Sequence, residues 1–190
     1  MCGIVGYIGK EKALASFLDG LSRLEYRGYD SCGVVGIKEG KFFLEKKPGK
    51  IHELRKELKK FLEEKYPIGI FHTRWATHGR PSEANAHPHL DCKGEIALVH
   101  NGIIENYLQL KESLVKEGHK FASETDTEVI VHLIEKFYKG SLKDAIRKAI
   151  KKLKGSFSLG VISVNDPTRL IAVRKGSPLI IGLGKEGNFI

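Results

Sequence analysis

The 190-residue sequence has few cysteines, and Cys2, Cys32 and Cys92 lie far apart. Three cysteines at these spacings cannot form a disulfide framework, and no CxxC pair suggests a redox or metal site. No apolar run approaches the roughly 18 residues that a membrane span requires, and no secretory signal is recognisable at the N-terminus. These absences predict a soluble protein of the reducing cytoplasm that has no membrane partner.

Acidic residues are outnumbered, with 23 against 32 lysines and arginines, and the formal net charge is +9. An excess of this size raises a nucleic-acid hypothesis. In the most basic segment, residues 136–154, apolar residues nevertheless recur at helical spacing, so the lysines are expected on the solvated face of an amphipathic helix. Base stacking would need interleaved aromatics, and only Tyr138 is near. We therefore expect no nucleic-acid partner.

No internal repeat, low-complexity tract or Ser/Pro-rich linker divides the chain, which predicts one domain over residues 1–190. Strands are predicted at residues 2–8, 32–37, 41–46, 68–71, 95–100, 157–164, 169–173 and 179–183. Helices are predicted at residues 14–24, 51–62, 107–115, 125–137 and 142–153, the fourth with a Thr125–Glu128 capping box. The hairpin links favour antiparallel pairing, so the fold class is predicted to be α+β with helices covering the sheets.

Cys2 is a candidate nucleophile that needs no histidine partner. A small second residue permits removal of Met1, and the thiol and a free α-amine would then share one residue. An α-amine with a pKa of about 7.7 to 8.0 is a competent base near neutral pH. A chain that keeps Met1 would lack this base, and Met1 would project into the space of the base. The alternative is that Cys2 is only a small apolar residue opening a strand.

The segment HTRWATHG, residues 72–79, directly follows the predicted strand at 68–71. Loops that leave strands are where binding groups concentrate. Arg74 offers a planar fork suited to a substrate carboxylate, and Trp75 is placed to close over a small ligand. The alternatives are a surface salt bridge for Arg74 and a position in the core for Trp75.

Two further candidate binding features are a pair of neutral hydrogen-bond donors and an acidic side chain. The Asn101 amide and the Gly102 N–H are the pair that an oxyanion hole requires, although Asn-Gly is also a common tight turn. Asp126 suits a substrate ammonium, and it also suits the first turn of a helix. Among the histidines His87 and His89 are the closest pair, but the tight spacings of known zinc sites are missing, so no metal is expected.

Taken together, these segments resemble the glutaminase domain of the class II glutamine amidotransferases, which are N-terminal nucleophile hydrolases. The resemblance covers nearly the whole chain and is specific to a branch that aminates a sugar phosphate. It rests on CGIVGYIG from residue 2, RLEYRGYDS from 23, HTRWATHG from 72, NAHPH from 85, HNGIIENY from 100 and SETDTEV from 123. It implies a four-layer αββα sandwich of two antiparallel sheets between helices.

The resemblance also implies residue roles. Cys2 would attack the carboxamide of L-glutamine, with its α-amine as base and no cofactor, and release glutamate and ammonia. The implied positions are Asn101 and Gly102 for the oxyanion, Arg74 for the α-carboxylate, Asp126 for the α-ammonium, Thr77 and His78 in the pocket wall, Trp75 in the closing loop, and His87 and Arg27 in loops linked to the site.

A full-length member of this branch would continue through two sugar-isomerase domains, which are absent from these 190 residues, and is expected to be a homodimer. The glutaminase domain would supply ammonia to those domains. Two competing hypotheses stay open on the sequence. The chain is either a glutamine-binding module without turnover, or a glutaminase domain that serves a different amination acceptor.

Overall fold

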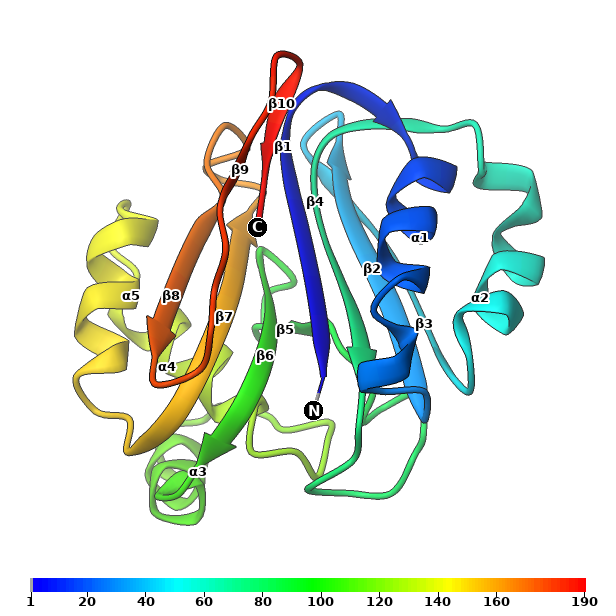
Figure 1. Ribbon diagram of the computed structural model, residues 1–190. Helices are drawn as coiled ribbons and strands as arrows, with labels where there is room; N and C mark the ends of the chain where they lie inside the picture. Colours follow the sequence, from blue (N-terminus) through cyan, green and yellow to red (C-terminus); the bar gives the residue numbers. More distant parts are fainter. Residues whose placement is uncertain (1) are drawn as a thin grey trace.

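The computed structural model describes residues 2–190 as four layers, two antiparallel sheets packed between helices (Figure 1). The strands are β1 (Gly3–Ala13), β2 (Ser31–Lys38), β3 (Lys41–Pro48), β4 (Lys65–Arg74), β5 (His89–Leu90), β6 (Ile96–Ile104), β7 (Gly155–Ser163), β8 (Ile171–Lys175), β9 (Gly182–Leu183) and β10 (Gly187–Phe189). The helices are α1 (Leu14–Ser22), η1 (Glu25–Arg27), α2 (Ile51–Glu57), η2 (Leu58–Phe61), α3 (Tyr107–Lys116), α4 (Glu128–Phe137) and α5 (Leu142–Ile150). The α+β class and the αββα sandwich are confirmed.

The larger sheet, in the order β3-β2-β4-β1-β10-β9, packs one face against α1 and α2. Phe17 of α1 is buried and its ring stacks on Phe71 of β4, with centroids 4.6 Å apart. Burial of one such side chain contributes about 1.5 to 3 kcal/mol. The β2–β3 hairpin turns at Glu39 and Gly40, whose φ angles of 52° and 73° match a type I′ turn. This layer holds β4, whose end carries the HTRWATHG segment.

The smaller sheet, in the order β5-β6-β7-β8, is covered by α3, α4 and α5. Helix α4 is buried along most of its length because it packs against α3, α5 and the strands β5 and β6. At the start of α5 the Ser141 hydroxyl accepts a hydrogen bond from the Asp144 N–H at 3.3 Å. This helix buries Leu142 and Ile146 and exposes its lysines, which confirms the amphipathic interpretation of the basic segment.

The two sheets meet face to face through branched apolar side chains such as Ile70 of β4 and Val99 of β6, both fully buried. Within the larger sheet, Gly3 of β1 pairs with Thr73 of β4. Residue 2 therefore lies beside the end of β4. Its backbone N–H reaches the Asn101 side chain of β6 in the other sheet, 3.3 Å away. The sandwich thus brings the predicted nucleophile and the predicted oxyanion donors together.

The structure corrects the sequence prediction in three places. Strands β5 and β10 were not predicted, and the strand predicted at residues 179–183 is the two-residue β9, which pairs with β10 in the larger sheet. The capping box is wrong. Helix α4 begins at Glu128, whose carboxylate accepts from the N–H groups of Ala122 and Ser123 at 2.8 and 2.7 Å, while the Thr125 hydroxyl lies 2.9 Å from that of Ser123.

The helices are short compared with the thickness of a bilayer. Within residues 2–190, no helix combines the length and the apolar character that spanning a membrane would require. The helices that cover the sheets are each ten residues or shorter.

Candidate active site

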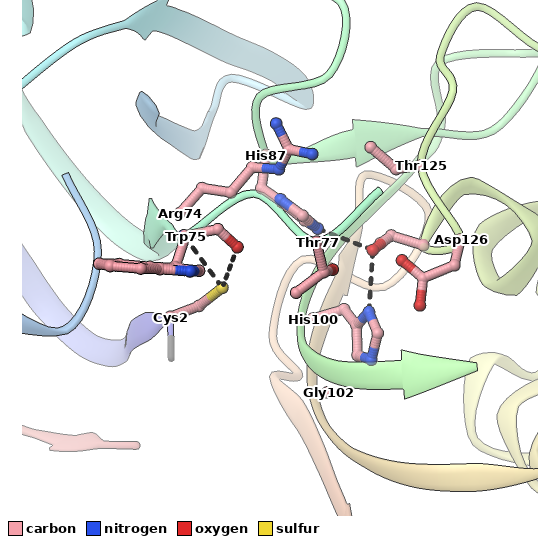
Figure 2. Close-up of a pocket in the computed structure, with 10 residues that line it drawn as sticks. Cys2, Arg74, Trp75, Thr77, His87, His100, Gly102, Thr125 and Asp126 are labelled. Carbon is pink, nitrogen blue, oxygen red and sulfur yellow. Dashed lines mark hydrogen bonds between the residues drawn. The ribbon is translucent and has the colours of Figure 1, made fainter. Parts of the chain in front are cut away.

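Cys2 lies directly before β1, with its thiol against the backbone that leaves β4 (Figure 2). The Trp75 N–H donates to Cys2 Sγ at 3.4 Å, and Sγ lies 3.8 Å from the Trp75 carbonyl oxygen. Burial raises the pKa of the Cys2 thiol, and the Trp75 hydrogen bond and the Arg74 guanidinium offset this only in part. The thiol is therefore protonated near neutral pH and needs a base before it can attack.

The backbone on either side of the thiol is also held. Besides the contact of the Cys2 N–H with Asn101 Oδ1, Arg27 Nε donates to the Cys2 carbonyl oxygen at 3.1 Å. The Gly3 N–H donates to Thr73 Oγ1 at 3.2 Å. Arg27 thus contacts the candidate nucleophile directly. The expectation about where Met1 projects lies outside the described residues.

Arg74 is the buried cation of the site, only 3% exposed. Its Nη2 donates to the carbonyl oxygens of His78 and Gly79, the second at 3.0 Å. Among residues 2–190 its Nη1 has no hydrogen-bond partner, and Asp30 Oδ1 is 4.0 Å away. Burial lowers the pKa of Arg74, but a guanidinium keeps its charge in proteins. An unpaired buried donor is costly, and a substrate carboxylate would satisfy it.

Asp126 is the buried acid on the opposite wall of the pocket, 3% exposed. Its Oδ2 accepts the Ile104 N–H at 2.8 Å, which ties the carboxylate to the end of β6. Its Oδ1 lies 3.7 Å from His78 Nδ1. One oxygen is thus fixed by the backbone, while the other remains able to receive a cation such as an α-ammonium. Asp126 precedes α4 and makes no cap there, so its interpretation as a helix-capping residue is wrong.

Trp75 and Thr77 form the exposed rim of the pocket. The Trp75 side chain is 48% exposed, and its ring meets the edge of Tyr29 at 5.5 Å between centroids. A core position for Trp75 is therefore wrong. Thr77 Oγ1 lies 3.2 Å from His78 Nδ1. An exposed aromatic beside a half-buried thiol is suited to covering a bound small molecule.

Asn101 and Gly102 are consecutive residues inside β6, so the tight-turn interpretation of Asn-Gly is wrong. Asn101 Oδ1 faces the Cys2 N–H, and Gly102 lines the same pocket as the thiol. Gly102 has a φ of 149°, and a Cβ there would fall 2.1 Å from the Ser156 carbonyl oxygen of β7. Only glycine fits this position.

His87, His100 and the Thr127 hydroxyl close the floor of the pocket, and a third buried histidine, His72, packs against His87. His87 Nε2 and His100 Nδ1 lie 2.9 and 2.8 Å from Thr127 Oγ1, and His72 Nε2 donates to the His100 carbonyl oxygen at 2.9 Å. Burial lowers the pKa of His72 to about 3 and of His100 to about 4, and it lowers the pKa of His87 well below 6.5. All three are neutral at pH 7, so the Thr127 hydroxyl donates to one ring and accepts from the other.

These residues enclose a pocket of about 240 Å³, part of which is open to solvent. It is lined by Cys2, Arg74, Trp75, Thr77, His87, His100, Gly102, Thr125, Asp126 and Thr127. Figure 2 shows the Cys2 thiol at one side and Asp126 at the other. Asn101 and Arg27 instead line a neighbouring hollow that shares Cys2 with this pocket.

Three residues that no sequence pattern indicated hold the site in place: Asp30, Thr73 and Thr127. Asp30 Oδ2 accepts the Ala76 N–H, and the Asp30 N–H donates to the Arg74 carbonyl oxygen at 3.1 Å. These contacts fix the path of the chain after β4. Asp30 lies in the segment RLEYRGYDS, and Thr127 lies in SETDTEV, so the motifs contained the residues although nothing in the sequence indicated their partners.

Comparison with known proteins identifies the fold. Glutamine phosphoribosylpyrophosphate amidotransferase from B. subtilis, complexed with ADP and GMP, superposes with a TM-score of 0.86 at 29% identity, over all of this chain and 41% of that one. A second solved structure, an allosteric regulatory enzyme of purine biosynthesis, gives 0.85 at 29% identity over the same shares. The fold is therefore that of the N-terminal nucleophile amidotransferases.

The sequence comparisons narrow this class to a family. Residues 72–190 match the family described as glutamine amidotransferase domain. The whole chain is 62% identical to the glutamine–fructose-6-phosphate aminotransferase [isomerizing] of Aquifex aeolicus and 56% identical to that of Pyrococcus horikoshii. The chain belongs to the glutamine amidotransferase family. It spans about a third of these relatives, 32% of each.

Proposed function

We propose that this chain is a single glutaminase domain over residues 1–190 that hydrolyses L-glutamine to glutamate and ammonia. Cys2, with Met1 removed, attacks the side-chain carboxamide carbon. The bond from this carbon to the amide nitrogen breaks, a γ-glutamyl thioester forms on Sγ, and the nitrogen leaves as ammonia. Water then hydrolyses the thioester and releases glutamate. No cofactor is required.

The protonated state of the thiol supports a role for the α-amine. Because burial raises the pKa of Cys2, a base must take its proton. The histidines of the pocket floor are poor bases near pH 7, because burial lowers the pKa of His100 to about 4 and that of His87 well below 6.5. An α-amine on Cys2 accepts the thiol proton and returns it to the leaving nitrogen. It would also donate to Asn101 Oδ1, which now accepts from the Cys2 N–H at 3.3 Å.

Substrate recognition is the part of the proposal that the charges support most directly. Among residues 2–190, Arg74 Nη1 is buried without a hydrogen-bond partner, and the Asp126 oxygen that does not accept from Ile104 lies 3.7 Å from His78 Nδ1. A free α-amino acid carries both complementary charges. Asn101 and Gly102 would hold the oxyanion, Thr77 and His78 would line the wall, and Trp75 would cover the ligand. The pairing of Arg74 and Asp126 in the pocket of a cysteine is the observation that carries the proposal.

The acceptor is proposed from the relatives' names. In a full-length protein the ammonia would convert fructose 6-phosphate to glucosamine 6-phosphate, on sugar-isomerase domains outside these 190 residues, within a cytoplasmic homodimer. Exposed apolar side chains near the C-terminus suit contact with such domains, since Ile180, Ile181 and Leu183 are 81%, 64% and 84% exposed. His87 and Arg27 would link the pocket to that region.

The first experiment measures glutamate release against glutamine concentration. The processed chain should turn over, and Cys2→Ala should abolish release while still binding glutamine. Cys32→Ala and Cys92→Ala are the matched controls and should keep activity, because neither thiol lines the pocket. Saturable glutamine binding without release by the processed protein would instead support the binding module.

A second experiment tests the base. Intact-mass analysis separates chains with and without Met1, and each population is assayed for glutamate release. A retained Met1 turns the Cys2 nitrogen into an amide, which does not accept a proton near neutral pH. We expect a folded but nearly inactive protein. Full activity from chains that retain Met1 would exclude the α-amine as the base.

A third experiment tests the acceptor. The 190-residue chain given glutamine and fructose 6-phosphate should release ammonia without forming amino sugar, since the sugar site is assigned to the missing domains. The chain joined to those domains should form glucosamine 6-phosphate. Formation of a different aminated product would support the alternative acceptor.

A further inference from the structure

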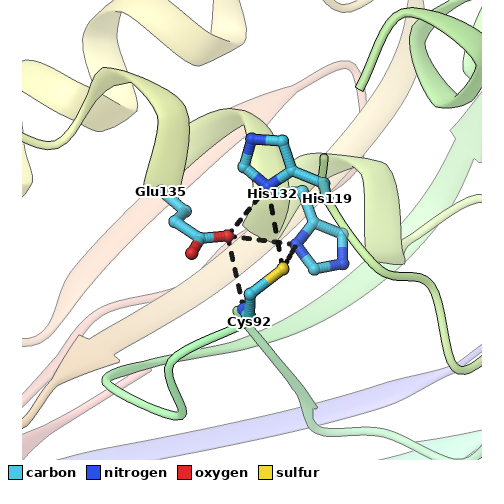
Figure 3. Close-up of side chains that lie close together, drawn as sticks. All are labelled: Cys92, His119, His132 and Glu135. Atoms are coloured by element: carbon cyan, nitrogen blue, oxygen red, sulfur yellow. Dashed lines mark hydrogen bonds and ion pairs between the residues drawn. The ribbon is translucent and has the colours of Figure 1, made fainter. Parts of the chain in front are cut away.

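A second group of reactive side chains lies outside the pocket, on the face of the smaller sheet that carries α4. It consists of Cys92, His119, His132 and Glu135 (Figure 3). Cys92 follows β5, His119 follows α3, and His132 and Glu135 occupy one face of α4 at spacing i, i+3. None of the four lines the active-site pocket.

One atom from each side chain converges on a common point. The four ligand atoms, Cys92 Sγ, His119 Nδ1, His132 Nδ1 and a Glu135 oxygen, all lie within 4.8 Å of one another. Sγ is 3.8 Å from His119 Nδ1 and 3.5 Å from His132 Nδ1, and Glu135 Oε2 is 2.9 and 3.3 Å from the same two nitrogens. Figure 3 shows the two rings turned toward the thiol and the carboxylate.

Four of the six separations among these atoms are close to the edges of a tetrahedral zinc site. Bonds of about 2.3 Å to sulfur and 2.0 to 2.1 Å to nitrogen or oxygen, at tetrahedral angles, place sulfur about 3.5 Å and the lighter ligands about 3.3 Å from one another. The four measured distances lie within a few tenths of an ångström of those values. Small rotations of the side chains would seat an ion.

Surrounding groups support the ligands in the way that outer partners of a metal do. The Lys120 N–H donates to Cys92 Sγ at 3.4 Å, which favours an anionic sulfur. His132 is 1% exposed, and its Nε2, the nitrogen that faces away from the cluster, lies 3.6 Å from Glu128 Oε1. Within residues 2–190, Nε2 makes no hydrogen bond at this distance, and a small shift would let Glu128 accept from it as the outer carboxylate of a ligating imidazole does. Glu128 is itself held by backbone N–H groups of the preceding loop.

We propose that Cys92, His119, His132 and Glu135 bind one zinc ion as a structural site. Thiolate and imidazole donors select zinc over magnesium or calcium, which prefer oxygen. A thiolate and a carboxylate neutralise the charge of the divalent ion, and four protein ligands leave no open position for catalysis. The ion cross-links the turn after β5 and the loop after α3 to α4. Helix α4 follows the loop that carries Asp126 and Thr127, so the ion stiffens one wall of the pocket.

The test uses the tag-free 190-residue chain, stripped with a chelator and titrated with Zn²⁺ and then with Co²⁺ as a spectroscopic probe. We expect one ion per chain with a Kd below about 1 μM, the visible bands of tetrahedral Co²⁺ and a thiolate charge-transfer band. Zinc at 100 times its Kd should raise Tm by about 5 to 10 °C. Binding should weaken at acid pH, since protons compete for the ligands.

Variants distinguish this site from a plain hydrogen-bond network. Cys92→Ser should remove the charge-transfer band, and both it and His119→Ala should weaken zinc binding at least 100-fold and abolish the rise in Tm. Circular dichroism of the zinc-free variants checks that they fold. His52→Ala, on the exposed side of α2, is the control and should bind zinc like the parent. Glutamate release at a permissive temperature should change little. Absence of a tight site in the parent, or equal binding by Cys92→Ser, would overturn the proposal.

Discussion

Acidification should remove stability from this fold through the buried histidines in and beside the pocket floor. Burial lowers the pKa of His72 to about 3 and of His100 to about 4 in the folded protein. In an unfolded chain each histidine takes up a proton near pH 6.5. The folded state therefore binds fewer protons between these values. The stability that these neutral histidines contribute is fully present above pH 6.5 and is lost as the pH falls toward their folded-state pKa values.

The size of the loss follows from the pH interval between the unfolded and folded pKa values of each histidine. Each proton that the unfolded chain binds and the folded protein does not lowers the free energy of unfolding by about 1.4 kcal/mol for each pH unit of acidification. For His100 the window is about 2.5 units, so the free energy of unfolding should fall by about 3 kcal/mol between pH 6.5 and 4. His72 adds a similar amount over the same range. A domain of this size has about 5 to 15 kcal/mol in total, so the effect approaches the whole stability.

Urea titrations at several pH values between 7.5 and 4, followed by circular dichroism, measure the free energy of unfolding. A chelator removes any contribution from bound metal. His72→Gln keeps a neutral N–H donor near the His100 carbonyl oxygen, which His72 Nε2 contacts at 2.9 Å. In this variant the slope of the free energy of unfolding against pH should be smaller by up to about 1.4 kcal/mol per pH unit below pH 6.5. His52→Gln controls for removal of a surface histidine.

The pH slope is the decisive quantity, because His72→Gln will also lower stability at every pH through imperfect packing. A stability that stays flat between pH 6.5 and 4 in the parent would contradict the reasoning. So would a slope that His72→Gln leaves unchanged, since the structure assigns the withheld proton to a ring that this variant lacks.

Other substitutions probe the pocket itself. Arg74→Ala should lower kcat/KM for glutamine by one to two orders of magnitude or more, as loss of a charge-assisted hydrogen bond costs about 1.5 to 3 kcal/mol; unchanged kinetics would contradict the carboxylate role. Asn101→Ala should lower kcat by about 10²- to 10³-fold with little change in KM if it holds the oxyanion. Gly102→Ala should lower Tm sharply, because its Cβ would collide with the Ser156 carbonyl oxygen, and a Tm equal to the parent's would contradict this geometry.

The long elements of the fold were predictable because their apolar residues recur with a clear period. Helix α5 and the β2–β3 hairpin have both the period and the turn residues that bound them. Strands β5 and β10 were missed because two or three residues carry no period, and they exist only through pairing with β6 and β1. The Thr125–Glu128 capping box failed because the Glu128 carboxylate satisfies backbone donors of the loop before α4.

The site was predictable as a set of residues, although their roles stay predictions. Cys2 and Arg74 belong to recognisable segments at strand ends, and the structure brings them into one pocket. The positioning residues were not predictable. Asp30 reaches the Ala76 N–H across 46 positions of sequence, and Thr127 reaches His87 across 40. Nothing local distinguishes such residues, because their role depends on strand register.

The spacing of the cysteines in the sequence did not exclude a zinc site of the kind proposed. The absence of a CxxC pair rules out ligands that one short loop supplies, but Cys92 lies 40 positions before His132. In the sequence only the i, i+3 spacing of His132 and Glu135 was visible, and such a pair is common on helices. A cross-link that closes a long segment also restricts the unfolded chain more than one within a short loop. An ion bound by both Cys92 and α4 would therefore stabilise the fold more than one bound within a short loop. The same long separation of its ligands is why the sequence does not reveal the site.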